Sequence, residues 1–475
     1  MYRSIKSILL ALSITVALFS CTERNEPATE RKVSTDPRSL QISENRRFLV
    51  TGDGKPFFWL GDTGWLFNRL TREEAEIYFE DRRKKGFNVV QAMLLHDVPS
   101  RNIYRDSSVV RADVGQPMVT PGNDFKDSVA YDYWDHVDFM IKKAAEKNIY
   151  MALVPVWGTN VKDKKVKLES AKKYAEFLGK RYKDQWNIIW LNGGDIQGSV
   201  ENKIWKAIGE TLRKYDPNHL ITFHPRGRTA SSDWFHNAKW LDFNMVQSGH
   251  RRYNQDTIKK EKNHFGPDNW RYIEVDYKLQ PIKPTIDGEP SYEDIPQGLH
   301  DPKEPRWTAA DVRRYGYWSV FAGAFGYTYG HNSVMQIYKK TDKNPAYGPR
   351  DEWKVALNAE GAKQMIYLKK LMLSRSYLDR VPDQSIIAGQ NGEKYEHLVA
   401  TRGKDYAMVY TFTGRNFELN MGKIEGKNVN ATWYDPRTGH ETAMGQVPNA
   451  GVRLFDPPGE PKDGNDWVLI LDKIN

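Results

Sequence analysis

The sequence Asn187-Ile-Ile-Trp-Leu-Asn-Gly-Gly-Asp195 decides the fold class, because a short apolar, strand-like run ends here in two glycines and an acid. A second run, Pro284-Thr-Ile-Asp-Gly-Glu289, has the same form and also ends in a carboxylate. If both runs are parallel strands of one barrel, the two acids project from the same rim, where barrel enzymes place their chemistry. Two carboxylates facing each other across a cleft are what glycosidic bond cleavage requires. The surrounding sequence should then alternate strands and helices.

Strand-like and helix-like segments do alternate over the first three quarters of the chain. The eight predicted strands are 57–60, 88–95, 150–156, 187–191, 220–223, 243–246, 285–286 and 326–329. Apolar residues recur at helical spacing in 71–85, 130–147, 169–183, 202–215, 309–322 and 359–373. This pattern predicts an α/β fold, a (β/α)8 TIM barrel. An open doubly wound sheet is the alternative, but no glycine-rich phosphate loop follows the first strand, and the count of eight favours closure.

The beginning of the chain is typical of a bacterial lipoprotein signal. Residues 1–21 carry Arg3 and Lys6 and then an apolar run, 8–19, which is too short to span a bilayer. The run ends at Ser20 and Cys21, the only cysteine of the chain, where such signals place the residue that is lipidated. An ordinary secretory signal with an incidental cysteine is the alternative. We expect a mature protein held at the cell envelope by a lipid anchor, in the outer membrane and facing the periplasm or the surface.

Three segments follow the signal. Residues 22–38 are polar and contain prolines, so we expect a flexible tether. The catalytic barrel is predicted over 39–375 and opens with a hairpin around the turn Gly52-Asp-Gly-Lys55. From 380 to 475 helical periodicity stops and short alternating runs separated by turns predict a small antiparallel β-sandwich. Its predicted strands are 386–388, 396–401, 406–412, 430–434 and 467–471.

Composition and motifs exclude several other functions. Aromatic residues form 12% of the 475 residues, which excludes a disordered chain and suits sugar binding by ring stacking. The net charge is +9, but Lys and Arg are spread over helix faces, so nucleic acid is not an expected partner. The charge is compatible with an acidic polysaccharide. The chain lacks a Gly-x-Ser-x-Gly elbow, a GKS or GKT phosphate loop and an HExxH metal motif. We therefore expect no cofactor and no metal, and an oligo- or polysaccharide as substrate.

Polar and aromatic residues stand at the carboxyl end of every predicted strand. We expect these residues to bind substrate, with the two tryptophans as stacking platforms and the histidines as hydrogen-bonding groups. They are Asp62, Trp65, His96, Asp97, Trp157, Asn192, His224, Arg226, Gln247, His250, Tyr329 and His331. Any one of them could be an ordinary loop residue, since loops are polar everywhere. A complete set at one rim indicates a site.

The two acids receive separate roles. Asp195 is the predicted general acid/base, and Glu289 is the predicted nucleophile. A separation of about 5–5.5 Å between the carboxyl groups gives retention, which we favour, whereas roughly 6.5–9.5 Å gives inversion. Asp195 could instead cap a helix after Gly193-Gly194, and Glu289 could be a solvated turn residue. The other candidates for the acid are Asp62 and Asp97, and those for the nucleophile are Asp287 and Glu293.

Four motifs resemble glycoside hydrolase family 140, whose founder is an apiosidase. They are Phe58-Trp-Leu-Gly-Asp-Thr-Gly-Trp65, Phe87-Asn-Val-Val-Gln91, Trp190-Leu-Asn-Gly-Gly-Asp195 and Ile286-Asp-Gly-Glu-Pro290. The resemblance covers roughly residues 39–375, and the C-terminal part resembles the collagen-binding-type sandwich that accompanies this barrel. The family's catalytic Asp and Glu match Asp195 and Glu289.

The resemblance implies an activity as well as a fold. It implies cleavage of the linkage between apiose and galacturonic acid in the pectin rhamnogalacturonan II. The alternatives are the same type of glycosidase on another glycan, a non-catalytic surface glycan-binding lipoprotein, and an adhesin that works through the sandwich.

Overall fold

The computed structural model describes residues 36–256 and 265–474. The predicted signal peptide with Cys21 and most of the predicted tether lie outside the described residues.

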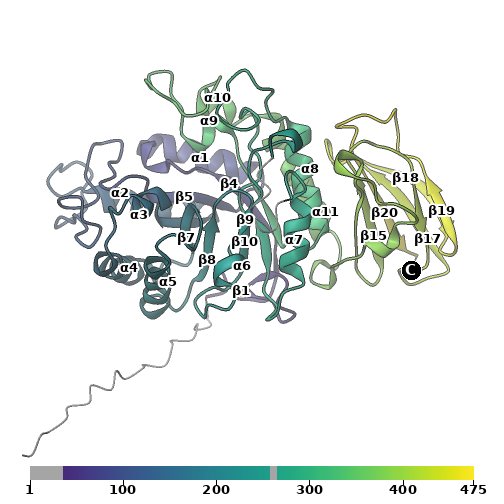
Figure 1. The fold of residues 1–475 in the computed structure, drawn as a ribbon, viewed down its shortest axis with the longest axis horizontal. Coiled ribbons are helices and arrows are strands. Elements are labelled where there is room, and N and C mark those ends of the chain that lie inside the picture. Colours follow the sequence, from purple (N-terminus) through teal and green to yellow (C-terminus); the bar gives the residue numbers. More distant parts are fainter. Residues whose placement is uncertain (1–35, 257–264, 475) are drawn as a thin grey trace, which may run out of the picture.

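One nine-stranded sheet forms the barrel (Figure 1). Its strands follow the order β8-β7-β6-β5-β4-β12-β11-β10-β9, and the first and last of the eight long strands, β4 and β12, pair in parallel. The open doubly wound alternative is therefore wrong, and the predicted TIM barrel is confirmed. The eight are β4 (Trp59–Thr63), β5 (Val89–Leu95), β6 (Tyr150–Val156), β7 (Ile188–Ile196), β8 (Leu220–Pro225), β10 (Asn244–Gln247), β11 (Thr285–Asp287) and β12 (Gly326–Tyr329). The short β9 (Thr229–Ala230) pairs antiparallel with β10.

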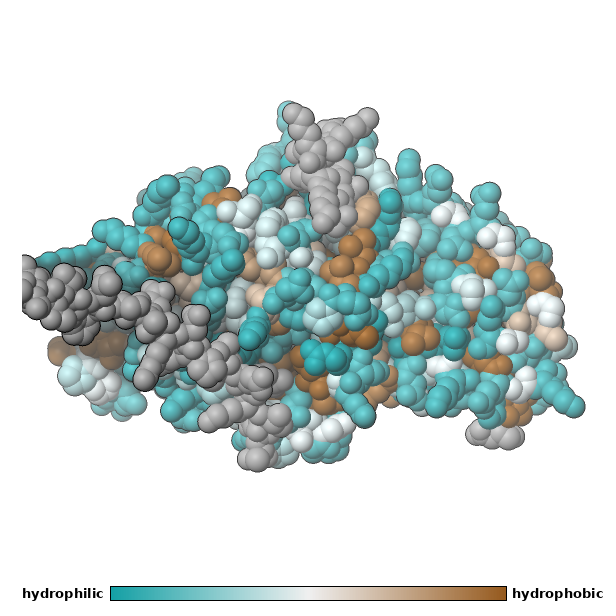
Figure 2. Space-filling model, turned by 60° about the horizontal axis from the view of Figure 1, so that its bottom comes forward, coloured by the Kyte–Doolittle hydropathy of each residue, from teal (hydrophilic) through white to brown (hydrophobic). Residues whose placement is uncertain are grey.

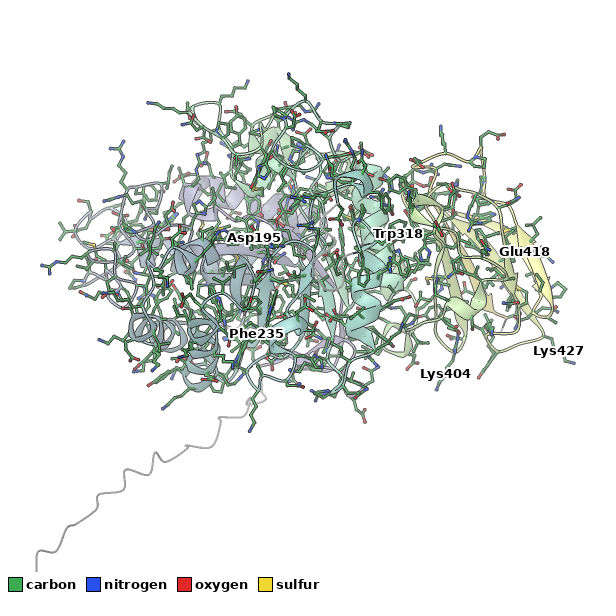
Figure 3. All side chains as sticks on the ribbon, viewed as in Figure 1. Asp195, Phe235, Trp318, Lys404, Glu418 and Lys427 are labelled. Atoms are coloured by element: carbon green, nitrogen blue, oxygen red, sulfur yellow. The ribbon has the colours of Figure 1, made fainter. Side chains whose placement is uncertain are left out.

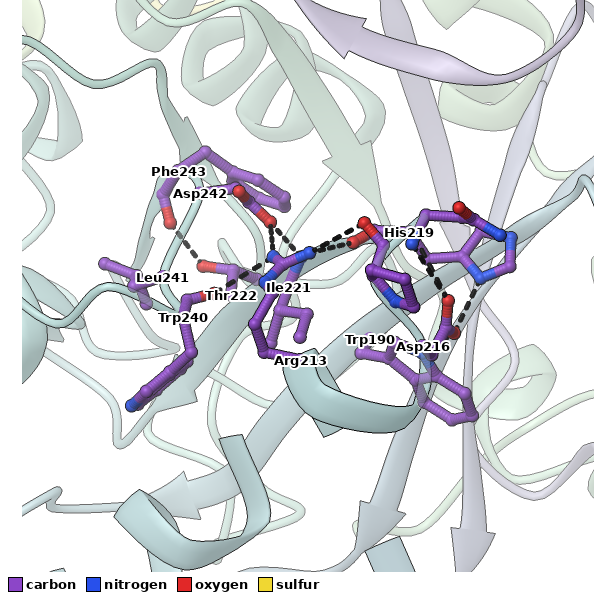
Figure 4. A network of polar contacts seen from close by, with 12 residues as sticks. Trp190, Arg213, Asp216, His219, Ile221, Thr222, Trp240, Leu241, Asp242 and Phe243 are labelled. Atoms are coloured by element: carbon purple, nitrogen blue, oxygen red, sulfur yellow. Dashed lines mark hydrogen bonds and ion pairs between the residues drawn. The ribbon is translucent and has the colours of Figure 1, made fainter. Parts of the chain in front are cut away.

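The barrel closes between β8 and β10 through contacts just ahead of β10. The backbone N–H of Asp242 donates to the carbonyl of Ile221 at 2.8 Å, and the hydroxyl of Thr222 donates to the carbonyl of Phe243 at 2.6 Å. Arg213 reaches in from a covering helix, forms an ion pair with Asp242 and donates to the carbonyl of His219 at 3.1 Å (Figure 4). This network holds β8 and β10 together at their amino-terminal ends, away from the rim that carries the candidate acids.

The helices cover the outside of the barrel close to their predicted positions. Thr71 and Glu74 form the capping box that the sequence indicates at the start of α1. Between β8 and β11, where the sequence shows no clear helix, residues 226–256 and 265–284 contain the short α6 and α7 and a 3-10 turn at 253–255. The long helices are α1 (Arg72–Lys84), α2 (Tyr133–Glu146), α4 (Leu168–Tyr182), α5 (Asn202–Tyr215), α8 (Ala309–Phe321) and α11 (Glu360–Leu373). The others are α3 (Gly158–Lys162), α6 (Ser232–Phe235), α7 (Asn269–Tyr277), α9 (Asn332–Met335) and α10 (Trp353–Ala356).

A small antiparallel sheet lies beneath the barrel at its amino end (Figure 1). It consists of β1 (Leu40–Ile42), β2 (Leu49–Thr51) and β3 (Pro56–Phe57). The turn between β2 and β3 has Gly54 at φ 80° and includes the hydrogen bond from its N–H to the carbonyl of Thr51 at 2.8 Å. The predicted hairpin is therefore present.

The C-terminal part is an antiparallel β-sandwich, as predicted. Its larger sheet has the order β13-β14-β15-β20-β17-β18, and a second sheet pairs β16 with β19. Residues 384–386 form a 3-10 turn instead of the predicted strand, because the Asp383 carboxylate accepts the N–H of Ser385 at 3.0 Å and turns the backbone. The strands are β13 (Val381–Pro382), β14 (Val399–Arg402), β15 (Tyr406–Thr411), β16 (Phe417–Asn420), β17 (Asn428–Tyr434), β18 (Glu441–Pro448), β19 (Val452–Phe455) and β20 (Trp467–Lys473).

Helix α8 joins the sandwich to the barrel. Figure 3 places Trp318 on this helix, at the side of the barrel that faces the sandwich. Buried Arg313 donates two hydrogen bonds to Asp466, at 2.9 and 2.7 Å, and the ring of Tyr317 stacks on Tyr410 with centroids 4.8 Å apart. Arg314 is buried among five aromatic rings from both parts of the chain. The rings are Trp307, Tyr315, Trp318, Tyr395 and Phe412.

Hydrophilic residues cover most of the face drawn in Figure 2, with apolar residues scattered among them. Among residues 36–256 and 265–474, no helix is both long and apolar enough to cross a bilayer.

Candidate active site

Asp195 lies at the carboxyl end of β7, where the strand leaves its regular register with β8 (Figure 3). Gly193, Gly194 and Asp195 have φ values of 98°, 109° and 47°. Glycine adopts this left-handed region freely, and Asp tolerates it better than most residues. A β carbon on Gly194 would also stand 2.5 Å from the ring of Trp157. The glycine pair thus turns the chain so that Asp195 projects into the barrel mouth.

Glu289 follows β11 and lies between two histidines. The Nε2 of His224, at the end of β8, is 3.1 Å from one carboxylate oxygen, and the Nε2 of His250, after β10, is 3.3 Å from the other. Glu289 is almost fully buried. Buried carboxylates persist as anions only when such partners compensate for lost water. This pairing fixes both the charge and the direction of Glu289.

The two acids have opposite electrostatic environments. Asp195 is solvent-accessible at the cavity surface, but the cavity walls displace much of the surrounding water. This desolvation, and then the charge of Glu289, raise the pKa of Asp195 to about 6. Burial also tends to raise the pKa of Glu289, but hydrogen bonds and charge from His224 and His250 outweigh it and lower that pKa to about 2. Carboxyl groups with pKa values driven apart in one cavity are suited to separate acid and nucleophile roles.

A cavity of about 730 Å³ opens at this rim, and both acids line it. Six of the predicted substrate-binding residues line the cavity with them. They are Trp65, His96, Trp157, Arg226, Gln247 and His250. Trp65 and Trp157 form one wall, with ring centroids 5.4 Å apart, and Trp65 donates to the hydroxyl of Tyr292 at 2.9 Å.

The other six predicted binding residues lie outside this cavity lining. His224 stands behind Glu289, and exposed Asp97 lines a neighbouring cavity of about 310 Å³. The remaining four are buried and bonded within the protein. Asp62 accepts the hydroxyl of Tyr78, Asn192 donates to the carbonyl of Trp205, Tyr329 donates to Glu293, and His331 caps α9.

The rival nucleophile candidates have structural partners. Asp287 accepts hydrogen bonds from Ser248 and Asn269, at 2.7 and 3.0 Å. Glu293 accepts from Tyr329 at 2.6 Å and from the backbone N–H of Gly361 at 3.1 Å. Neither residue lines the cavity.

Several cavity residues were not predicted from the sequence. Arg228 and Arg251 flank the predicted Arg226 and His250, so their positions in the same loops could have indicated them. Burial, and then the charge of Arg228, lower the pKa of both Arg226 and Arg251. Arg228 is paired with Asp256 at 2.7 Å, so the three guanidinium groups give this side of the cavity a positive charge that one carboxylate partly balances. Others come from loops without periodicity and left no signal. They are Arg69, Tyr292, His300, Lys343 and Tyr347.

No three His, Cys, Asp or Glu side chains of the described residues form a group that could hold a metal ion.

The model of the "Apiosidase-like, catalytic domain" family matches residues 43–379. The chain belongs to the apiosidase-like family. A second model, "Putative collagen-binding domain of a collagenase", matches residues 381–472 of this apiosidase-like protein. A search of curated proteins finds no match.

Two solved structures are similar over nearly the whole length of the apiosidase-like chain. One, described as "Glycoside hydrolase", is 47% identical with a TM-score of 0.87 and covers 94% of this chain and 99% of its own. Another, a glycoside hydrolase family 5 protein from Bacteroides vulgatus ATCC 8482, is 44% identical with a TM-score of 0.87 and covers 94% and 95%. This apiosidase-like protein is therefore a glycoside hydrolase.

Proposed function

We propose that this glycoside hydrolase cleaves the linkage between apiose and galacturonic acid in rhamnogalacturonan II, with Asp195 as general acid/base and Glu289 as nucleophile. The observation that carries the assignment of roles is the division of pKa values within one cavity, about 6 for Asp195 and about 2 for Glu289. The first group holds a proton in mildly acidic solution, and the second is ionised there.

The proposed reaction has two steps and retains configuration. In the first, Glu289 attacks the anomeric carbon while protonated Asp195 gives its proton to the leaving oxygen. The products are a glycosyl ester on Glu289 and an alcohol. In the second, Asp195 takes a proton from water, and the water oxygen displaces Glu289 from the sugar. His224 and His250 keep Glu289 ionised and oriented before the first step, and they stabilise its carboxylate again when the second step releases it.

The choice of an acidic substrate is supported by the charge of the cavity. Arg226 and Arg251 lie on one side of it and would face the carboxylate of a galacturonate, while Arg228 beside them is held by Asp256. The family model carries the apiosidase description, which supports apiose as the released sugar.

The test is sugar release from purified rhamnogalacturonan II oligosaccharides by the wild type and by Asp195→Asn and Glu289→Gln. General acid/base groups contribute about 10²- to 10⁴-fold, so we expect losses of kcat of at least that order with folding unchanged. Asp301→Asn is the matched control, because it removes an exposed acid from a loop bordering the cavity. Unchanged turnover in both active-site variants would refute the roles. Release of a different sugar by the wild type would refute the substrate, and NMR of the first-formed anomer decides between retention and inversion.

We also propose that Cys21 is lipidated and anchors the protein at the cell envelope. The support is the sequence of residues 1–21 alone. Cys21→Ser should abolish labelling by a fatty-acid analogue and move the protein from the membrane fraction to the soluble fraction. Persistent labelling would contradict the proposal.

A further inference from the structure

Tyr347 has an unusual backbone conformation at the edge of the cavity. It lies in the loop between α9 and α10, is half-buried and lines the cavity together with Asp195 and Glu289. Its φ is 57°, in the left-handed region. A bulky side chain rarely adopts this conformation, because its β carbon comes too close to the backbone carbonyl.

Contacts from the barrel fix the backbone on either side of Tyr347. The amide of Gln336 both donates to and accepts from the backbone of Ala346, at 2.9 Å in each case. Asn332 donates to the carbonyl of Tyr347 at 3.0 Å. Arg306 donates to the carbonyl of Gly348 at 2.7 Å. Such strain persists only where the surroundings determine the conformation in this way.

The side chain of Tyr347 is not bonded as structural tyrosines are. Buried Tyr329 donates its hydroxyl to Glu293, and buried Tyr292 accepts from Trp65. The hydroxyl of Tyr347 makes no hydrogen bond with any residue that the structure describes. The left-handed turn does not require a tyrosine, because glycine adopts such φ values without strain. The next residue, which has φ 53°, is a glycine, Gly348.

The ring of Tyr347 lies beside the two acids and beside a second cavity loop. Burial, and then the charges of Asp195 and Glu289, raise the pKa of Tyr347, which shows that the phenol lies within the field of both acids. The ring of His300 lies 6.0 Å from that of Tyr347, and Leu299 beside it also lines the cavity at φ 77°. Two loops thus bring strained, bulky residues over the cavity.

We propose that Tyr347 is a substrate-binding residue whose ring stacks on the sugar at the cleavage point and whose hydroxyl hydrogen-bonds to that sugar. Aromatic rings present a flat apolar face with a polar tip, which matches the face and rim of a sugar. This role deepens the proposed function, because it concerns the same cavity and explains why a strained position carries an aromatic residue.

The experiment compares Tyr347→Gly and Tyr347→Phe with the control Ala112→Gly. Ala112 is exposed, lies outside the cavity and has φ 56°, so its replacement relieves the same backbone strain without touching the site. Ala112→Gly measures the effect of relieving the backbone strain alone, whereas Tyr347→Gly also removes a ring that packs against the core, so its Tm can fall further. We expect Tyr347→Gly to lower kcat/KM by about tenfold, mostly through KM. Tyr347→Phe, which keeps the ring, should lose less.

The substrates are rhamnogalacturonan II oligosaccharides and a panel of other plant glycans. If the wild type cleaves only another glycan, the proposed substrate fails, and the Tyr347 comparison is made on the glycan that is cleaved. Unchanged kcat/KM of Tyr347→Gly on the cleaved glycan would overturn the proposal, whatever its Tm, and would leave Tyr347 a structural residue.

Discussion

At the scale of single residues, the two histidines that flank Glu289 determine which acid holds a proton. Without them, burial would raise the pKa of Glu289 and bring it towards that of Asp195. Two neighbouring acids with similar pKa values cannot divide the roles of donor and nucleophile cleanly. In the proposed mechanism, the histidines thus separate the two functions without contacting the proton that is transferred.

The first prediction concerns pH. The proposed mechanism requires Glu289 ionised, hence a pH above about 2, and Asp195 protonated, hence a pH below about 6. We expect a bell-shaped profile of kcat/KM that falls as pH rises through about 6. The measurement is kcat/KM against pH on a neutral and an acidic substrate. A profile that stays flat up to about pH 8 would contradict protonated Asp195 as the donor.

The second prediction separates the two limbs of this profile. His250→Phe removes one of the groups that lower the pKa of Glu289, so the acidic limb should move to higher pH. His250→Gln keeps an amide donor near the carboxylate, and its shift should be smaller. Equal profiles for the wild type and His250→Phe would show that His250 does not control Glu289.

The sequence pattern identifies the two acids but not every residue around them. Asp195 and Glu289 follow apolar strands directly, so the strand pattern places them at the rim. Tyr347 lies far from any strand, in a loop whose path depends on bonds from Gln336 and Asn332. Asp62 was predicted to bind substrate because it follows a predicted strand. It is instead buried and bonded to Tyr78 and Arg82. Alternation along a strand does not reveal which partner a polar side chain will find.

At the scale of elements, the backbone conformation at the end of β7 determines the positions of Asp195 and Trp157 in the cavity. Gly194 has φ 109°, and a β carbon there would stand 2.5 Å from the Trp157 ring that lines the cavity. The third prediction is that Gly194→Ala costs about 1–3 kcal/mol of stability and also lowers kcat, because Asp195 and Trp157 both shift. Thermal unfolding and turnover test it.

Gly389→Ala is the control for the glycine experiment. Gly389 has φ 76°, and a β carbon added there would have no atom within 4 Å, so the substitution strains only the backbone. Its stability should fall without a change in kcat. A Gly194→Ala variant with normal kcat would show that Asp195 does not depend on this turn.

Buried strands were predicted more accurately than exposed strands. Runs 150–156 and 326–329 match β6 and β12, because buried parallel strands are continuously apolar. The exposed β18 and β19 carry few buried residues and were not predicted. Apolar patterning reports burial, so an exposed strand leaves little trace in the sequence.

At the scale of the whole molecule, the contact between barrel and sandwich resembles an interior more than a joint between modules. Arg313 and Asp466 are buried there as an ion pair, and Tyr317, Tyr410 and Ile470 belong to the same core as the barrel residues. Burying charges is costly unless they remain paired. The interface should therefore respond strongly to the loss of one partner.

The fourth prediction is that Asp466→Ala destabilises the protein by about 3–5 kcal/mol, because Arg313 is left buried and unpaired. Glu425→Gln, which removes one partner of the exposed pair with Lys473, is the control and should cost at most about 1 kcal/mol. Chemical denaturation measures both. Equal effects in the two variants would show that the interface opens to water.

This shared core also bears on how the two parts were inherited. The two family matches end at residue 379 and begin at residue 381, so a recombination point is easily drawn there. A cut at that point would leave the α8 face around Tyr317 and Trp318 without its cover. A descendant that lost the sandwich would first need polar residues on that face. We therefore expect the barrel and the sandwich to be inherited together in related proteins.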